Sequence, residues 1–94
     1  VQLAPDDPHY NDTLGWLLVQ SDQAAEGLAF LRSASARMAE NPEIRFHLAA
    51  CLHRMGRQAE AKKELERALR SGAAFEGRDE ALALQKTLMA AANP

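Results

Sequence analysis

Apolar residues recur at helical spacing in five stretches of the chain, separated by short polar or glycine-containing breaks. Tyr10, Leu14 and Leu17 carry this spacing in the first stretch, and the third stretch repeats it with Ile44 and Leu48. Side chains three or four residues apart share one face of an α-helix, so these residues are expected to face the core. The pattern predicts an all-α fold with helices that begin near residues 8, 23, 42, 57 and 78.

Capping residues mark where the predicted helices start and stop. Asp7 and Asn41 each stand directly before a proline. A side-chain oxygen at this position accepts hydrogen bonds from the first free N–H groups of a helix, and proline suits the first helical position. Asp22 and Gly56 mark the turns that follow, because a left-handed backbone is easy for glycine and tolerable for aspartate. Two helical hairpins are therefore predicted.

The two hairpins repeat each other with a period of 34 residues, which separates Asp7 from Asn41 and Asp22 from Gly56. The second helix of each hairpin keeps the same order of small and large apolar residues. Small residues let the two helices of a hairpin approach closely, whereas leucines fill the space between hairpins. The corresponding residues are Gly27, Leu31 and Ala34 in the first hairpin, and Ala61, Leu65 and Ala68 in the second.

The period fades in the last predicted helix, where Gln85 and Lys86 stand 34 residues after Cys51 and Leu52. The last unit of a stacked array has no neighbour on one side and presents polar side chains to water. The final stretch is therefore predicted to be a C-terminal solvating helix.

The period and its residues resemble the tetratricopeptide repeat family, whose pattern is a helix-turn-helix unit of about 34 residues. The resemblance is carried by Leu14-Gly15, Leu18 and Gly27-x3-Leu31 in the first unit, and by Leu48-Ala49, Leu52 and Ala61-x3-Leu65 in the second. The chain departs from the pattern where Asn11 and Arg45 replace Trp, and where Ala39 and Ala73 replace the closing Pro. The resemblance implies a right-handed α-solenoid of antiparallel helix hairpins, with two units and a C-terminal capping helix.

The register of the units divides the chain into four expected parts. Residues 1–7 are expected to be the tail of a preceding repeat, because Pro5 stands 34 residues before Ala39. The first unit is expected over 8–41, the second over 42–73 and the C-terminal solvating helix over 74–94.

Residues 11–69 also resemble, more narrowly, the last repeats of large bacterial tetratricopeptide lipoproteins associated with PEP-CTERM/exosortase export systems. This resemblance implies that the chain is the C-terminal part of a larger bacterial protein at the cell envelope or in the periplasm. Such a protein takes part in exopolysaccharide-linked export or assembly. Without this resemblance, a cytoplasmic location is expected.

By the family resemblance, the first helix of each unit lines a concave groove that binds a peptide or protein segment. Trp16 and Arg54 are the expected anchors, because Trp and Arg combine a large contact area with hydrogen-bonding groups. Leu17 and Leu18 are expected to point to the core, which leaves Trp16 for the groove. The expected partner-binding residues are Asp12, Trp16, Val19, Gln20, Phe46, His47, Ala50, His53 and Arg54.

Two alternatives bear on this groove. Trp16 and Phe46 could instead pack against neighbouring helices, since aromatic residues often serve packing. Family members that capture an acidic C-terminal tail use a clamp of Lys, Asn and Arg, and this chain keeps none of these residue types at the corresponding positions. Capture of such a tail is therefore not expected. The corresponding positions are Asp12, Trp16, His47, Gly77 and Ala81.

Composition excludes several other classes of function. The net charge of −2 provides no global basic field, so a nucleic-acid partner is not expected. His47 and Cys51 are spaced as a zinc-ligand pair, but the chain has no second pair, so neither a metal nor another cofactor is expected. No apolar run is long enough to cross a bilayer, and no phosphate loop or nucleophile signature indicates an enzyme.

The sequence therefore predicts a protein–protein interaction scaffold that binds a partner of unknown identity through the groove. The alternative is a structural end-cap or self-association segment of a long solenoid with no ligand of its own. In that case the chain could form a homo-oligomer.

Overall fold

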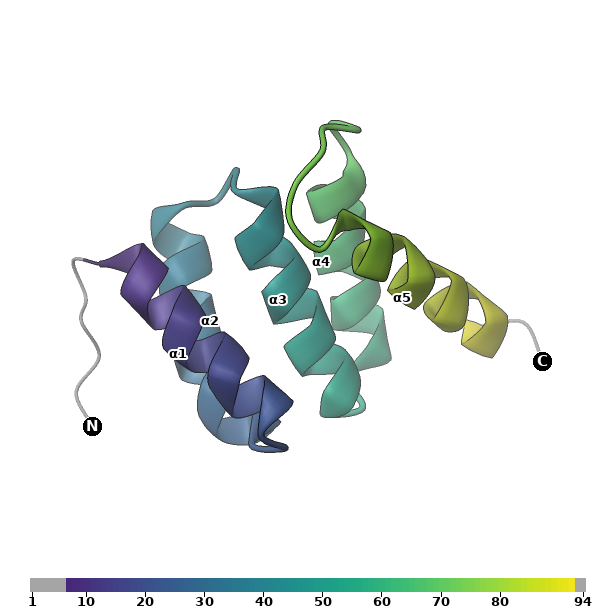
Figure 1. Ribbon diagram of the computed structural model, residues 1–94. Coiled ribbons are helices and arrows are strands. Elements are labelled where there is room, and N and C mark those ends of the chain that lie inside the picture. The colour runs from purple at the N-terminus through teal and green to yellow at the C-terminus, as the bar shows by residue number, and fades with distance from the viewer. Residues whose placement is uncertain (1–6, 93–94) are drawn as a thin grey trace.

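Five helices form two antiparallel hairpins and a final single helix, which follow one another across the molecule (Figure 1). This computed structural model describes residues 7–92, and no strand occurs among them. The predicted all-α fold is confirmed, and the predicted helix starts agree within one residue. The helices are α1 (Pro8–Gln20), α2 (Ala24–Arg37), α3 (Pro42–Arg54), α4 (Gln58–Leu69) and α5 (Arg78–Ala92).

Local capping sets the ends of the helices as predicted. The side chains of Asp7 and Asn41 each accept a hydrogen bond of 3.0 Å from the backbone N–H three residues further on. The turns between paired helices contain Asp22 and Gly56, whose φ angles are 65° and 78°. These left-handed residues reverse the chain, so that each second helix returns along the first.

Glycine brings α1 and α2 into close contact. A Cβ atom on Gly27 would lie 2.7 Å from the carbonyl oxygen of Gly15, and both residues are buried. At the corresponding positions of the second hairpin, Ala49 and Ala61 are fully buried. The prediction that small residues allow close approach is therefore confirmed, and the first hairpin uses the smallest residue on both sides.

The core lies between the hairpins and under α5. Its largest buried apolar side chains include the predicted core leucines, Leu48 and Leu65. Arg45, which replaces the aromatic residue of the repeat pattern, forms an ion pair with Glu64 on α4. Its Nε also donates a 2.8 Å hydrogen bond to the carbonyl oxygen of Ala39. A guanidinium thus joins α3 to α4 and to the turn between the hairpins.

The apolar face of α1 departs from the prediction. Tyr10 and Leu17 were expected to face the core, but they are 49% and 55% exposed. The residues 34 positions later, Ile44 and Cys51, are only 1% and 0% exposed. The difference arises because α2 packs against that face of α3, whereas no helix in the described part of the chain covers the same face of α1.

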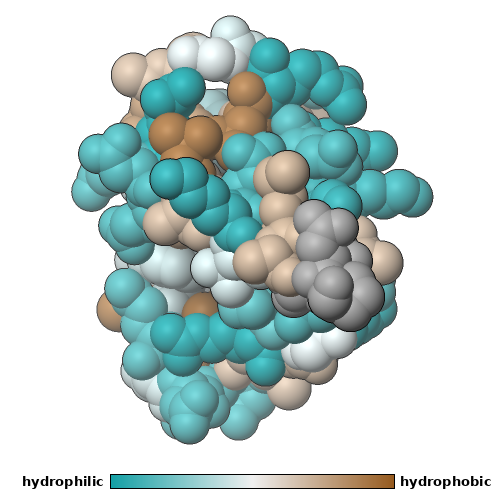
Figure 2. Space-filling model, turned by 90° about the vertical axis from the view of Figure 1, so that its right-hand side faces the viewer, coloured by the Kyte–Doolittle hydropathy of each residue, from teal (hydrophilic) through white to brown (hydrophobic). Residues whose placement is uncertain are grey.

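The exposed residues of α5 are mostly polar or small, with Met89 as a large apolar exception that is 52% exposed. Ala83 and Lys86 are exposed, although their counterparts in α3, Ala49 and Leu52, are buried. Figure 2 shows the end of the molecule that carries α5 as a mostly hydrophilic surface with small apolar patches. At the end of the period Lys86 therefore faces water, whereas Gln85 is half-buried beside the hollow between α4 and α5.

Candidate protein-binding groove

A groove of about 360 Å³ lies along the side of the molecule formed by α1, α3 and the start of α5. These three helices lie in front of α2 and α4 in Figure 1. The stacking of the hairpins therefore brings residues that are distant in the sequence to one surface. The groove is lined by Asp12, Thr13, Trp16, Leu17 and Gln20 from α1, by Glu43, Phe46 and His47 from α3, and by Glu76, Gly77 and Glu80 from the last loop and α5.

Aromatic rings form the centre of the groove. The ring of Trp16 is half-buried and stacks on that of His47, with centroids 4.1 Å apart and an angle of 16° between the planes. Phe46 lies 5.7 Å from Trp16 by ring centroids and is buried. Gly77 closes over Phe46, because a Cβ at Gly77 would lie only 3.0 Å from the Phe46 ring. Part of Trp16 remains open to a ligand.

A buried polar pair fixes the aromatic residues. His47 Nδ1 and Asp12 Oδ1 are 2.7 Å apart, and both side chains are largely shielded from water. A short hydrogen bond between buried polar groups restrains their orientation, since breaking it leaves both groups without a partner. The pair joins α1 to α3 and holds the imidazole against Trp16. The groove is therefore preorganised at its centre.

The groove carries negative charge. Glu43, Glu76 and Glu80 line it, and none of the three forms an ion pair among the described residues. Within the part of the chain that the structure describes, neither Lys nor Arg contributes to the lining. Next to these carboxylates, Leu17 is exposed and Trp16 half-exposed. The surface thus combines apolar area with unpaired negative charge.

Five of the nine residues predicted from the sequence line the groove, and four do not. Val19 is buried against α2, where a Cβ on Gly27 would lie 3.4 Å from it. Ala50 and His53 are half-buried outside the lining, and His53 Nδ1 lies 2.9 Å from the side-chain oxygen of Gln58. Arg54 is exposed at the end of α3, also outside the lining. The five residues in the lining are Asp12, Trp16, Gln20, Phe46 and His47.

Six lining residues were not among the predicted partner-binding residues. Two signals could have identified some of them: Glu43 precedes Phe46 by three residues on one helix face, and Glu80 follows Phe46 by the 34-residue period. No periodic signal indicated Glu76, because its position depends on the path of the last loop. The six residues are Thr13, Leu17, Glu43, Glu76, Gly77 and Glu80.

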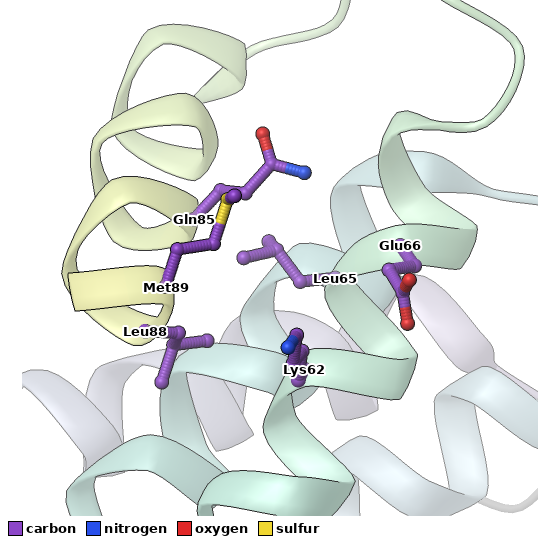
Figure 3. Close-up of a pocket in the computed structure, with 6 residues that line it drawn as sticks. All are labelled: Lys62, Leu65, Glu66, Gln85, Leu88 and Met89. Atoms are coloured by element: carbon purple, nitrogen blue, oxygen red, sulfur yellow. The ribbon is translucent and has the colours of Figure 1, made fainter. Parts of the chain in front are cut away.

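A second, smaller hollow of about 220 Å³ lies between α4 and α5 (Figure 3). Leu65 points from α4 toward Met89 on α5, and Lys62 lies at the edge of α4. This hollow is mainly a seam between two packed helices. It lacks the aromatic residues and the group of carboxylates that distinguish the groove.

The histidine and cysteine of the possible zinc pair have other partners. His47 is paired with Asp12, and the Cys51 thiol donates to the carbonyl oxygen of Ala24 at 3.2 Å. Burial raises the pKa of the Cys51 thiol, with a smaller opposing effect of nearby arginines. Within residues 7–92, no cluster of three or more His, Cys, Asp or Glu side chains could hold a metal ion. The helices found there are too short or too polar to span a membrane.

The stacked hairpins and the groove across them define an α-helical repeat protein of the solenoid class. The sequence model described as "Tetratricopeptide repeat" matches residues 18–90, which is most of the chain. The chain therefore belongs to the tetratricopeptide repeat family, whose members are typically non-enzymatic scaffolds for protein–protein interaction. No curated protein and no solved structure shows significant similarity to it.

Proposed function

We propose that this chain is an interaction module that binds a segment of a partner protein in the groove formed by α1, α3 and α5. One observation carries the proposal: Trp16 is held by its stack on His47 yet keeps part of its surface open beside the exposed Leu17. Tryptophan is a frequent anchor in protein interfaces, because burying it gains much contact area with little loss of side-chain freedom. Membership of the family supports a protein partner.

Selection of peptides from a displayed library tests this function. The bait is the whole chain, and enriched peptides are then measured against two variants. Thr13→Phe places a large ring in the groove from an exposed position, whereas Ala29→Phe places the same ring on the exposed side of α2. We expect the selected peptides to bind the wild type and Ala29→Phe equally, and to bind Thr13→Phe at least about tenfold more weakly.

Circular dichroism first establishes that both variants are folded. Equal binding of the selected peptides to the wild type and to Thr13→Phe would show that the groove is not their site. A selection that enriches no peptide dependent on the groove would also overturn the proposal.

A second candidate role, as a packing segment of a longer array, has its own support. Tyr10 and Leu17 are exposed at positions whose counterparts, Ile44 and Cys51, are covered by a neighbouring hairpin. Another hairpin that packs on α1 as α2 packs on α3 would cover this apolar face. Tyr10 does not line the groove, so Tyr10→Lys separates the two roles.

Sedimentation velocity over a range of concentrations tests the packing role. If the exposed face of α1 drives self-association, the wild type associates at high concentration and Tyr10→Lys remains monomeric. A wild-type chain that stays monomeric throughout would count against self-association.

The narrower sequence resemblance supports one further proposal, that the protein acts at the bacterial cell envelope in exopolysaccharide-linked export. Fractionation of the source bacterium with an antibody against the chain is the test. The envelope fraction should contain the protein, and recovery from the cytoplasm alone would reject this location.

A further inference from the structure

Among the described residues, those that line the groove include four carboxylates and no Lys or Arg. Asp12 is paired with His47, which leaves Glu43, Glu76 and Glu80 without an ion-pair partner among the described residues. Like charges that face one hollow repel each other, and a bound cation relieves this repulsion. An acidic segment of a partner would increase this repulsion. Charge complementarity therefore favours a basic ligand.

We infer that the groove selects an arginine-bearing segment of a partner protein, with the guanidinium placed between Trp16 and the carboxylates of Glu43, Glu76 and Glu80. This inference rests on the proposed function of the groove. A guanidinium offers planar donors that pair with two carboxylate oxygens at once, and it stacks on aromatic faces. A half-exposed Trp beside unpaired carboxylates provides both kinds of contact.

The carboxylates come from different elements, which indicates how the site is assembled. Glu43 lies in the first turn of α3, Glu76 in the last loop and Glu80 in the first turn of α5. Gly77 has a φ angle of 93°, which other residues rarely adopt, and its lack of a side chain lets the loop pack directly against the ring of Phe46. The last loop and α5 thus supply much of the acidic lining, while α1 supplies most of the apolar area.

A metal ion is a less suitable occupant than a guanidinium. No cluster of three or more His, Cys, Asp or Glu side chains within residues 7–92 is close enough to hold one. A nucleic acid is disfavoured by the same carboxylates, because its phosphates are negative. A guanidinium carries several N–H donors in one plane and pairs with one or two carboxylates, so it does not need the close shell of ligands that a metal ion requires.

The test uses the peptide selection described above, carried out in parallel on the wild type and on the double variant Glu43→Gln/Glu80→Gln. These two side chains form no ion pair with any other described residue, so the substitutions keep the size of the side chain and remove its charge without breaking a described ion pair. Wild-type pools should be enriched in arginine, and the double variant should lose this enrichment. Glu66→Gln removes an exposed carboxylate on α4 and serves as the control.

Affinity measurements on one enriched peptide make the test quantitative. Each of Glu43→Gln and Glu80→Gln should weaken binding about tenfold, as expected for loss of a charge-assisted hydrogen bond. Exchange of the peptide arginine for lysine should also weaken binding, and added salt should do so in the wild type more than in the double variant.

The outcomes separate this inference from the proposed function. Suppose that the selected peptides are neutral or acidic and bind Thr13→Phe more weakly than the wild type. The groove would then remain the binding site, but its selectivity for arginine would be overturned. Arginine pools that bind Glu43→Gln/Glu80→Gln as tightly as the wild type would also overturn it. Absence of any groove-dependent pool would overturn both.

Discussion

Replacing Gly27 by alanine should destabilise the protein, although alanine is the better helix former. Gly27 lies inside α2 at its closest approach to α1. On helix propensity alone, the substitution should stabilise a helix by about 1 kcal/mol. A Cβ at this position would lie 2.7 Å from the carbonyl oxygen of Gly15 and 3.2 Å from the Cβ of Leu18. Atoms so close cannot remain where they are.

The cost of this contact exceeds the gain in propensity. The nearest atom belongs to the backbone of α1, so no side-chain rotation relieves the clash and the two helices must separate. Overpacking of this kind costs roughly 1–3 kcal/mol. Because the separation also loosens contacts around the fully buried Leu31, the upper half of that range applies. The net loss of stability should be about 1–2 kcal/mol, which lowers the melting temperature of a domain of this size by roughly 5–15 °C.

Thermal and urea unfolding, followed by far-UV circular dichroism, measure this change. Ala61→Gly makes the reverse substitution at the corresponding position of the second hairpin. It should also destabilise, by about 1 kcal/mol or more, because it lowers helix propensity and removes a buried methyl group. If Gly27→Ala left the midpoint unchanged or raised it, the close crossing of α1 and α2 would be refuted.

Three further predictions concern the core and the charged surface. Leu48→Ala should lower the free energy of unfolding, measured in urea, by roughly 2–5 kcal/mol, because it removes buried apolar surface and leaves a cavity. An unchanged midpoint would show that Leu48 does not face the core. Cys51 should resist thiol reagents until denaturant is added, because its thiol is buried and its pKa is raised; rapid labelling of the folded chain would contradict this. Hydrogen bonds from Arg57 and then Arg32 lower the pKa of Glu60, so its stabilising effect is present above the pKa of an unfolded glutamate and is lost as the pH falls through the folded pKa. Glu60→Gln should therefore reduce the difference in urea midpoint between neutral and acidic pH, and an unchanged difference would refute this linkage.

The elements of the fold could be predicted because their signals are local. Asp7 and Asn41 cap their helices through backbone groups three residues away, and Asp22 and Gly56 turn the chain through their own φ angles. Burial on α1 was harder to predict. Leu17 follows the same apolar spacing as the buried residues of α3, but its exposure depends on whether a neighbouring helix covers it, which periodicity does not report.

Some groove residues could be predicted, because their position follows from their place along one helix. Trp16 and His47 were placed in the groove in this way and do line it, whereas Val19 was also placed there and is buried against α2. The acidic lining was missed because it depends on tertiary structure. Glu76 reaches the groove only because the last loop packs over Phe46, and no spacing in the sequence reveals that path.

The most direct test of the groove is to map a bound peptide on the chain by NMR. A peptide enriched on the wild type should shift the indole N–H resonance of Trp16, which is the single tryptophan of the chain. It should also shift backbone amides along α1, α3 and the start of α5, and leave the outer surfaces of α2 and α4 unchanged. Saturating peptide that shifts residues around the hollow between α4 and α5 and leaves Trp16 unchanged would contradict the account.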